Sequence, residues 1–155
     1  MRLLGIDPGT KCGYATMSDD GRIESGVLNL TPRRHEGGGM RFLRMRRHLA
    51  EILETAKPQA VAYEEVRRHL GTDAAHIYGG IVAIISSECE ARQIPYSGIP
   101  VGTVKKLATG KGNADKPMML AAAAERWPDV TMSDDNEADA RFVLLALSQQ
   151  LADPF

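Results

Sequence analysis

The amino-acid sequence predicts an α/β fold in which a mixed five-stranded sheet is flanked by helices. Two observations support this expectation. The first 30 residues divide into three short, largely apolar runs separated by turn residues, as in antiparallel strands. From residue 42 onward, segments with helical spacing of apolar residues alternate with short buried runs, which is typical of parallel strands joined by helices. The length of 155 residues fits one core, so we expect a single domain over residues 1–155.

Three strands are expected at the start of the chain, over residues 1–7, 12–18 and 22–30. The first strand has apolar residues on both of its faces and therefore reads as a strand buried within a sheet. The turn residues Asp19, Asp20 and Gly21 separate the second strand from the third, as in a hairpin. We therefore expect these first three strands to be antiparallel.

Helices and strands alternate in the rest of the chain. Apolar residues recur at helical spacing after the loop TPRRHEGGG until Pro58 ends the pattern; they are Phe42, Leu43, Met45, Leu49, Ile52 and Leu53. The segments expected to follow are a buried strand at 59–66, a helix at 74–91, a short strand at 94–100, and helices at 115–126 and 135–151. Strands joined through helices in this way are expected to be parallel.

The net charge of −1 conceals separate basic and acidic regions. Residues 33–47 contain six arginines and one acidic residue, whereas acidic residues gather in the segment SDDNEAD at 133–139. This separation is compatible with a polyanion held by arginine and lysine and a metal held by carboxylates. A solvated, arginine-rich helix face would explain residues 33–47 equally well.

Cysteine spacing and apolar runs argue against several classes of protein. Cys12 and Cys89 are far apart and match no zinc or redox motif, so we expect two reduced, buried thiols. The sequence begins without a charged stretch followed by a long apolar one, and no apolar run reaches about 18 residues. We therefore expect a cytoplasmic protein without a membrane partner.

Three carboxylates fall at comparable places in the predicted fold. Asp7 ends the first strand, Glu64 lies near the end of the fourth, and Asp139 lies one turn inside the last helix. A buried carboxylate costs several kcal/mol unless a positive charge meets it. Phosphodiester hydrolysis with magnesium uses such oxygen ligands, with two ions about 3.5–4 Å apart. The sequence therefore predicts a site of this kind if the three side chains converge.

Each acidic residue also has a purely structural interpretation. The Asp7 side chain could bond backbone amides in a turn with Pro8-Gly9-Thr10. Glu64 and Glu65 alternate across their strand, so one of them could face solvent. Asp134 and Glu137 fit the cap and box-like pattern of a helix amino terminus, and we assign them that role.

Four motifs resemble those of a known family. They are LGIDPGT-x-x-GYA at the start, AYEEV, VKKLATGKGNADK, and EADA near the end. In this order they resemble the RuvC-type Holliday junction resolvases of the RNase H-like fold. The resemblance implies metal ligation by Asp7, by Glu64 rather than Glu65, and by Asp139. It also places Lys105 and Lys116 near the scissile phosphate or the DNA backbone.

The sequence departs from the family pattern at two places. Asn136 stands where members commonly carry an aspartate or histidine, and Asp135, four residues before Asp139, could replace that ligand. The fourth ligand therefore stays open between Asp135 and Asn136. Some members carry a stacking aromatic after the second acidic motif, where this chain has Arg67 followed by Arg68. Arginine also stacks on bases and binds phosphate, so we expect DNA contacts there.

The resemblance implies an enzyme that resolves Holliday junctions or related branched DNA by symmetric, metal-dependent nicking. Two Mg²⁺ ions, for which Mn²⁺ could substitute, would be the cofactor, and cleavage would leave a 3′-hydroxyl and a 5′-phosphate. Lys116 or Lys105 would stabilise the developing charge, and Lys111 lies in a loop that could close over phosphate. The setting would be recombination, repair or phage DNA processing in a bacterial or phage-infected cell.

Symmetric cutting implies a homodimer, with residues 74–89 or 40–53 as the interface. Two other functions remain open. One is a module that binds branched DNA without cutting it. The other is a nucleotide-binding domain, because GID-x-GT also resembles the phosphate loop of actin-like ATPases and sugar kinases, although 155 residues supply only one of their two domains.

Overall fold

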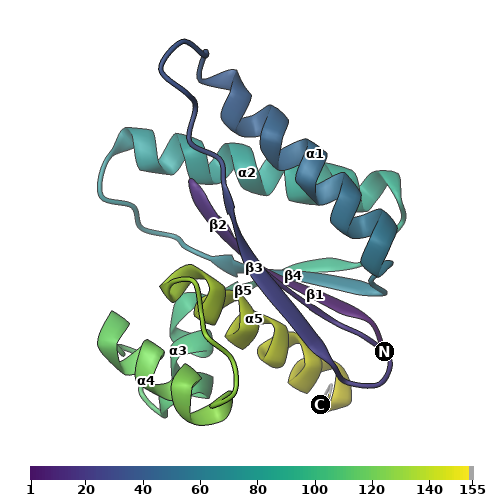
Figure 1. Cartoon of the computed structure of the whole chain (residues 1–155), viewed down its shortest axis with the longest axis vertical. Coiled ribbons are helices and arrows are strands. Elements are labelled where there is room, and N and C mark those ends of the chain that lie inside the picture. The colour runs from purple at the N-terminus through teal and green to yellow at the C-terminus, as the bar shows by residue number, and fades with distance from the viewer. Residues whose placement is uncertain (154–155) are drawn as a thin grey trace.

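A mixed five-stranded sheet forms the centre of the computed structural model, which describes residues 1–153 (Figure 1). Its strand order is β3 (Ile23–Asn29), β2 (Lys11–Met17), β1 (Leu3–Asp7), β4 (Ala60–Glu65) and β5 (Tyr96–Pro100). The first three strands pair antiparallel, and β1, β4 and β5 pair parallel. The predicted fold class and strand directions are confirmed.

Helices cover both faces of the sheet (Figure 1). On one face lie α1 (Gly39–Ala56) and α2 (Thr72–Ala91), and on the other lie α3 (Val101–Thr109), α4 (Lys116–Arg126) and α5 (Asp135–Ala152). Each face has its own apolar core, because strand side chains alternate between the faces. This three-layer arrangement exposes the strand ends at the edge of the sheet.

Helix α3 is an element that the spacing of apolar residues leaves unassigned. It has nine residues, and only Val104 among them is buried, so its apolar pattern is short. Gly110, which follows it, adopts a left-handed φ of 82° and donates its amide to the Lys106 carbonyl. A glycine at that position is a helix stop signal and is visible in the sequence.

Two glycines allow α5 to lie very close to the sheet. A Cβ atom on Gly5 would lie 2.6 Å from the Leu144 amide nitrogen, and one on Gly13 would lie 1.9 Å from the Asn136 carbonyl oxygen. A larger side chain at either of these two positions would force the helix away. The absence of side chains there therefore brings the acidic start of α5 against the end of β1.

Local expectations at the hairpin and the cysteines hold. The β2–β3 turn closes with the Ser18 amide donating to the Arg22 carbonyl over 3.0 Å, and Gly21 has a φ of 83°. Cys12 and Cys89 are buried free thiols. Within residues 1–153, none of the helices combines the length and the apolar character needed to span a membrane.

Candidate active site

Asp7 and Glu64 lie side by side at the ends of two neighbouring parallel strands. Ile6 of β1 pairs with Tyr63 of β4, so Asp7 and Glu64 occupy the next level of the sheet. Both side chains are largely buried, with 9% and 8% of their surface exposed. Two carboxylates from segments 57 positions apart therefore share one small volume.

Alternation along the strands decides which face these carboxylates occupy. In β4, Val61 belongs to the core under α1 and α2, and Ala62 to the core under α5. Glu64 is two residues after Ala62 and therefore points toward α5, whereas Glu65 points to the opposite face. This placement agrees with the assignment of Glu64, rather than Glu65, to the site.

Helix α5 adds two further carboxylates, Asp135 in its first turn and Asp139 one turn later. Asp134 caps the helix as expected, since its side chain accepts hydrogen bonds from the amides of Asn136 and Glu137 over 2.9 and 3.1 Å. The Asn136 side chain also donates to Asp134 over 3.3 Å. The two nitrogens of Asn136 are therefore engaged in the cap, while Asp135 contributes a carboxylate one turn before Asp139.

Glu137 departs from the box-like pattern expected of it. Its carboxylate accepts from the amide of Ser133, one residue before the cap, over 2.6 Å, and not from the cap residue. Its other oxygen accepts from the Ser25 hydroxyl on β3 over 2.7 Å. Glu137 therefore ties the start of α5 to β3, the outer strand of the sheet.

Arg141, which shares the Ser25 hydroxyl with this carboxylate, is a residue that the sequence patterns did not identify. Arg141 is 4% exposed, donates from Nε to the Ser25 hydroxyl over 2.7 Å, and lies with its guanidinium 5.1 Å from the centre of the Trp127 ring. A spacing of four between Glu137 and Arg141 within an apolar helix was the available signal. Ser25 and Trp127 carry no such signal, because only tertiary structure brings them there.

The carboxylates of the site raise one another's pKa. Burial first, and then the charges of Glu64, Asp139 and Asp135, raise the pKa of Asp7 well above its ordinary value. Burial and Asp139 raise the pKa of Glu64 to about 7, and Lys105 opposes this increase. Burial and Asp135 raise the pKa of Asp139 to about 6. The mutual repulsion shows that the predicted residues converge.

The donor atoms of this cluster suit a hard divalent cation. The Oδ1 atom of Asp139 is buried and has no hydrogen-bond partner in the described residues. The turn interpretation of Asp7 receives no support, because burial and neighbouring carboxylates alone account for its raised pKa. Within residues 1–153, no three His, Cys, Asp or Glu side chains are already gathered around one point as ion ligands. The carboxylates are therefore near one another without forming a preassembled ion site in the described residues.

The structure brings two of the five predicted basic residues to the carboxylates. Lys116 Nζ lies 3.4 Å from Asp135 Oδ2, and Lys105 on α3 lowers the pKa of both Glu64 and Asp139. The other three lie in exposed loops around the site: Lys111 between α3 and α4, and Arg67 and Arg68 between β4 and α2. Arg67 is 3.4 Å from Glu65.

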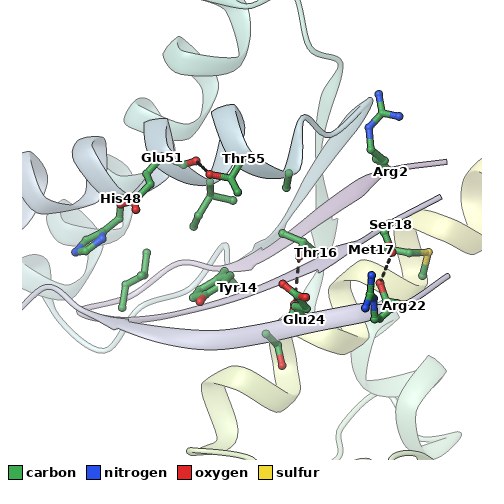
Figure 2. Close-up of a pocket in the computed structure, with 14 residues that line it drawn as sticks. Arg2, Tyr14, Thr16, Met17, Ser18, Arg22, Glu24, His48, Glu51 and Thr55 are labelled. Atoms are coloured by element: carbon green, nitrogen blue, oxygen red, sulfur yellow. Dashed lines mark hydrogen bonds between the residues drawn. The ribbon is translucent and has the colours of Figure 1, made fainter. Parts of the chain in front are cut away.

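A cavity of the structure lies away from these carboxylates. It has a volume of about 760 Å³ and is formed by α1 and the β2–β3 hairpin, with Tyr14, Glu24 and Glu51 among its lining residues (Figure 2). It opens near the start of β1, at Arg2, and none of the clustered carboxylates lines it. Cavity size therefore does not identify the reactive site in this fold, whereas the convergence of charge does.

A mixed sheet of this order, with carboxylates on adjacent strand ends facing an acidic helix, defines a nuclease of the RNase H-like fold class. The family model described as "Crossover junction endodeoxyribonuclease RuvC" matches residues 3–126. The chain belongs to this RuvC family, and the resemblance of its motifs is confirmed. The family match ends at residue 126, before α5, so the positions of Asp135 and Asp139 come from the structure and not from this match.

Relatives and solved structures extend the similarity to nearly the whole chain. The protein named crossover junction endodeoxyribonuclease RuvC in Halorhodospira halophila is 33% identical to this chain, over 74% of this chain and 70% of that protein. The protein of the same name in a Synechococcus strain is 30% identical, over 94% of this chain and 96% of that protein. Thermus thermophilus RuvC in complex with a Holliday junction substrate shares the fold, with a TM-score of 0.78, 22% identity, and coverage of 96% and 93%. The yeast mitochondrial Holliday junction resolvase Ydc2 gives a TM-score of 0.66 at 15% identity, over 97% and 79%.

These relatives do not favour either alternative function, the non-cleaving DNA module or the nucleotide-binding domain. The family is one of metal-dependent nucleases. The site therefore has to be considered with a metal and a DNA phosphate in it.

Proposed function

We propose that residues 1–155 act as one nuclease domain that resolves four-way or related branched DNA, with Asp7, Glu64 and Asp139 as its metal-binding carboxylates. The observation that carries this proposal is the convergence of these three side chains at one edge of the sheet, where they raise one another's pKa. A cluster of buried negative charges without a cation would only destabilise the fold. Its presence at strand ends therefore supports a catalytic role.

The fourth ligand in this proposal is Asp135. It is 24% exposed, lies one helical turn before Asp139 and raises that residue's pKa. Two Mg²⁺ ions, or Mn²⁺ in their place, would be held by these four carboxylates. When bound, such ions supply an activated water and offset negative charge on the phosphate.

The chain's own residues would orient the substrate. Lys105 and Lys116 flank the carboxylates from α3 and α4, so their ammonium groups can meet a phosphate held at the site. Charge that develops in the transition state would be stabilised there more strongly than in water, because the surrounding carboxylates are largely buried. Lys111, Arg67 and Arg68 would hold the backbone of the adjoining DNA from the exposed loops.

The proposed assembly is a homodimer acting in the cytoplasm. Each subunit provides one set of carboxylates, and two symmetric nicks require two such sets. The apolar positions within residues 74–89 and 40–53 remain the two proposed interfaces. In the structure these segments belong to α2 and α1, which pack together on the sheet face opposite α5.

A cleavage and binding assay on one labelled four-way junction tests the proposal. The wild-type protein should produce paired symmetric nicks with Mg²⁺ and none with EDTA. Asp7→Asn should bind the junction in a gel shift but leave both strands intact. Asp129→Asn, which removes an exposed carboxylate outside the site, should cut like the wild type.

Three outcomes would contradict the proposal. Normal cutting by Asp7→Asn would show that the site is assigned wrongly. Binding by the wild type without any scission in Mg²⁺ or Mn²⁺ would instead favour the non-cleaving module. Equal cutting of linear duplex and of junctions would indicate a less selective nuclease.

A further inference from the structure

We propose that the arginine segment, residues 33–47, is a second surface for the DNA sugar-phosphate backbone, on the side of the sheet opposite Lys105 and Lys116. This inference rests on the proposed junction cleavage and adds a place where a DNA arm is held. It explains a run of six arginines that the carboxylate site does not use.

The segment leaves the sheet beside the carboxylates. Asn29 at the end of β3 pairs with Lys11, and the Leu30 amide donates to the Thr10 carbonyl over 2.8 Å. Thr10 belongs to the turn that directly follows Asp7. The loop that carries Arg33 and Arg34 therefore begins at the same edge of the sheet at which β1 ends (Figure 1).

The start of α1 packs on the part of α2 that also supports the loop with Arg67 and Arg68. A Cβ atom on Gly80 would lie 2.3 Å from the Phe42 ring, so the first turns of α1 cross α2 in direct contact. Tyr78, two residues before Gly80, donates its hydroxyl to the Glu64 carbonyl and accepts from the Val66 amide, each over 2.9 Å. The same part of α2 thus supports both the start of α1 and the loop that carries Arg67 and Arg68.

Only part of the segment's charge is neutralised within the protein. Arg44 pairs with Glu36 and also donates to the Thr31 carbonyl, and Arg46 lies 3.3 Å from Glu88 on α2. These two arginines have structural partners. Arg33 lies 3.6 Å from the same Glu36 and remains 84% exposed. Within residues 1–153, the ion pairs include none made by the remaining three arginines, which are Arg34, Arg41 and Arg47.

Arg41 keeps an unpaired charge at the start of α1. Its Nε atom is buried and has no hydrogen-bond partner among the described residues, and the residue as a whole is half-buried. Buried donors in folded proteins are almost always paired, so this guanidinium is not fully satisfied within the protein. A phosphate at the exposed part of the guanidinium would offset its charge.

The chemistry of the segment favours the phosphate backbone over the bases. Guanidinium groups bind phosphate oxygens in a bidentate manner, which fits a row of arginines on a loop and a helix. The only Phe, Tyr or Trp in residues 33–47 is Phe42, and its ring is packed against Gly80. The segment therefore offers the DNA bases no free Phe, Tyr or Trp ring on which to stack. Its contact with DNA should then be independent of base sequence.

Two double variants test the inference in an Asp7→Asn background, in which binding is measured without cleavage. Arg33→Ala/Arg34→Ala removes two exposed charges from the arginine segment. Arg22→Ala/Lys57→Ala is the matched control, because it removes two exposed charges near the opposite ends of β1 and β3. Affinity for a four-way junction is measured by fluorescence anisotropy between 50 and 300 mM salt, chosen as roughly the range in which counterion release dominates.

The expected result follows from counterion release. Each lost phosphate contact should weaken binding roughly 5-fold at about 150 mM salt, so the arginine variant should lose roughly 25-fold, and its log–log salt slope should fall by about 2. The control should keep the affinity and slope of the parent. Circular dichroism and thermal unfolding of both variants would confirm that each remains folded.

The inference is overturned if the arginine variant binds within about twofold of its parent with an unchanged salt slope, or if the control loses as much. A parent protein that binds no junction at all would count against the proposed function itself, and the arginine surface would fall with it. Loss confined to the arginine variant, with a reduced slope, is the result that supports the second surface.

Discussion

Replacing Glu64 by glutamine should stabilise the metal-free protein while removing its ability to nick DNA. The Glu64 carboxylate is buried against α5 beside Asp139 and has a pKa of about 7 in place of 4.5. The folded protein therefore holds the proton more tightly than the unfolded chain. Glutamine keeps nearly the same shape but cannot ionise, so it removes the repulsion together with the ligand.

The sign and size of the effect follow from linkage. Below pH 4.5 both states are protonated at this residue, and its carboxylate costs the fold nothing. As the pH rises toward 7 the unfolded state loses its proton first, so the stability of the folded state falls. With these values the glutamine variant should be more stable than the wild type by about 1 kcal/mol at pH 5 and by about 3 kcal/mol at pH 8.

Urea unfolding in EDTA at the two pH values measures this difference. Glu65→Gln is the matched control, because it makes the same chemical change on the same strand but on the opposite face, beside Arg67. Its stability should stay within about 1 kcal/mol of the wild type at both pH values, since exposed ion pairs contribute little. Added Mg²⁺ should raise the urea midpoint of the wild type more than that of Glu64→Gln.

The reasoning would be refuted by a Glu64→Gln protein that unfolds at the wild-type urea midpoint at pH 8. An equal gain from Glu65→Gln would refute it as well, because it would show that net charge and not the buried cluster sets the stability.

Three further changes have expected outcomes. Lys105→Ala should slow nicking by roughly 100-fold with little change in junction affinity, because it removes one donor that stabilises charge in the transition state. Lys111→Ala should mainly weaken junction binding in a gel shift. The reverse pattern would exchange the roles of the two lysines. Gly13→Ala should lower the free energy of unfolding by about 1–3 kcal/mol, because its Cβ would lie 1.9 Å from a carbonyl oxygen of α5. Gly37→Ala is the control and should leave the urea midpoint unchanged, because a Cβ there meets nothing within 4 Å. Ser25→Ala removes the hydroxyl that joins the Glu137 carboxylate to the Arg141 guanidinium on α5. It should raise the Mg²⁺ concentration needed for half-maximal nicking and for thermal stabilisation. Unchanged values would show that this network does not position the helix.

The positions of Asp7 and Glu64 at strand ends could be predicted from the sequence, because apolar residues directly precede both carboxylates and a strand pattern is local. Alternation alone did not decide between Glu64 and Glu65, and the family resemblance supplied that choice. The α3 helix could not be located in the same way. It is short, and one buried valine gives no measurable period, so the glycine that ends it was the only clear signal.

The contacts that hold α5 in place could not be predicted, because they join residues that are distant in sequence. Ser25 and Arg141 are separated by 116 positions, and neither residue type marks such a contact. Gly13 could be recognised as a glycine inside a strand, which indicates a close approach by something. That the approaching atom is the Asn136 carbonyl, at the acidic start of α5, is a property of the packed fold alone.

The same features of the structure account for both the repulsion in the site and the means of holding it together. Glycines on β1 and β2 bring α5 closer to the sheet than any other residue would allow, and this closeness is what buries Asp139 against Asp7 and Glu64. Repulsion should then push the helix outward, yet its first turn is fixed by the Asp134 cap and by the hydrogen bonds from Glu137 to Ser133 and Ser25. Carboxylates that are held together by other contacts, and not by attraction for one another, retain their affinity for a cation. This anchoring network does not offset the repulsion of the site, which is left to be relieved by the metal.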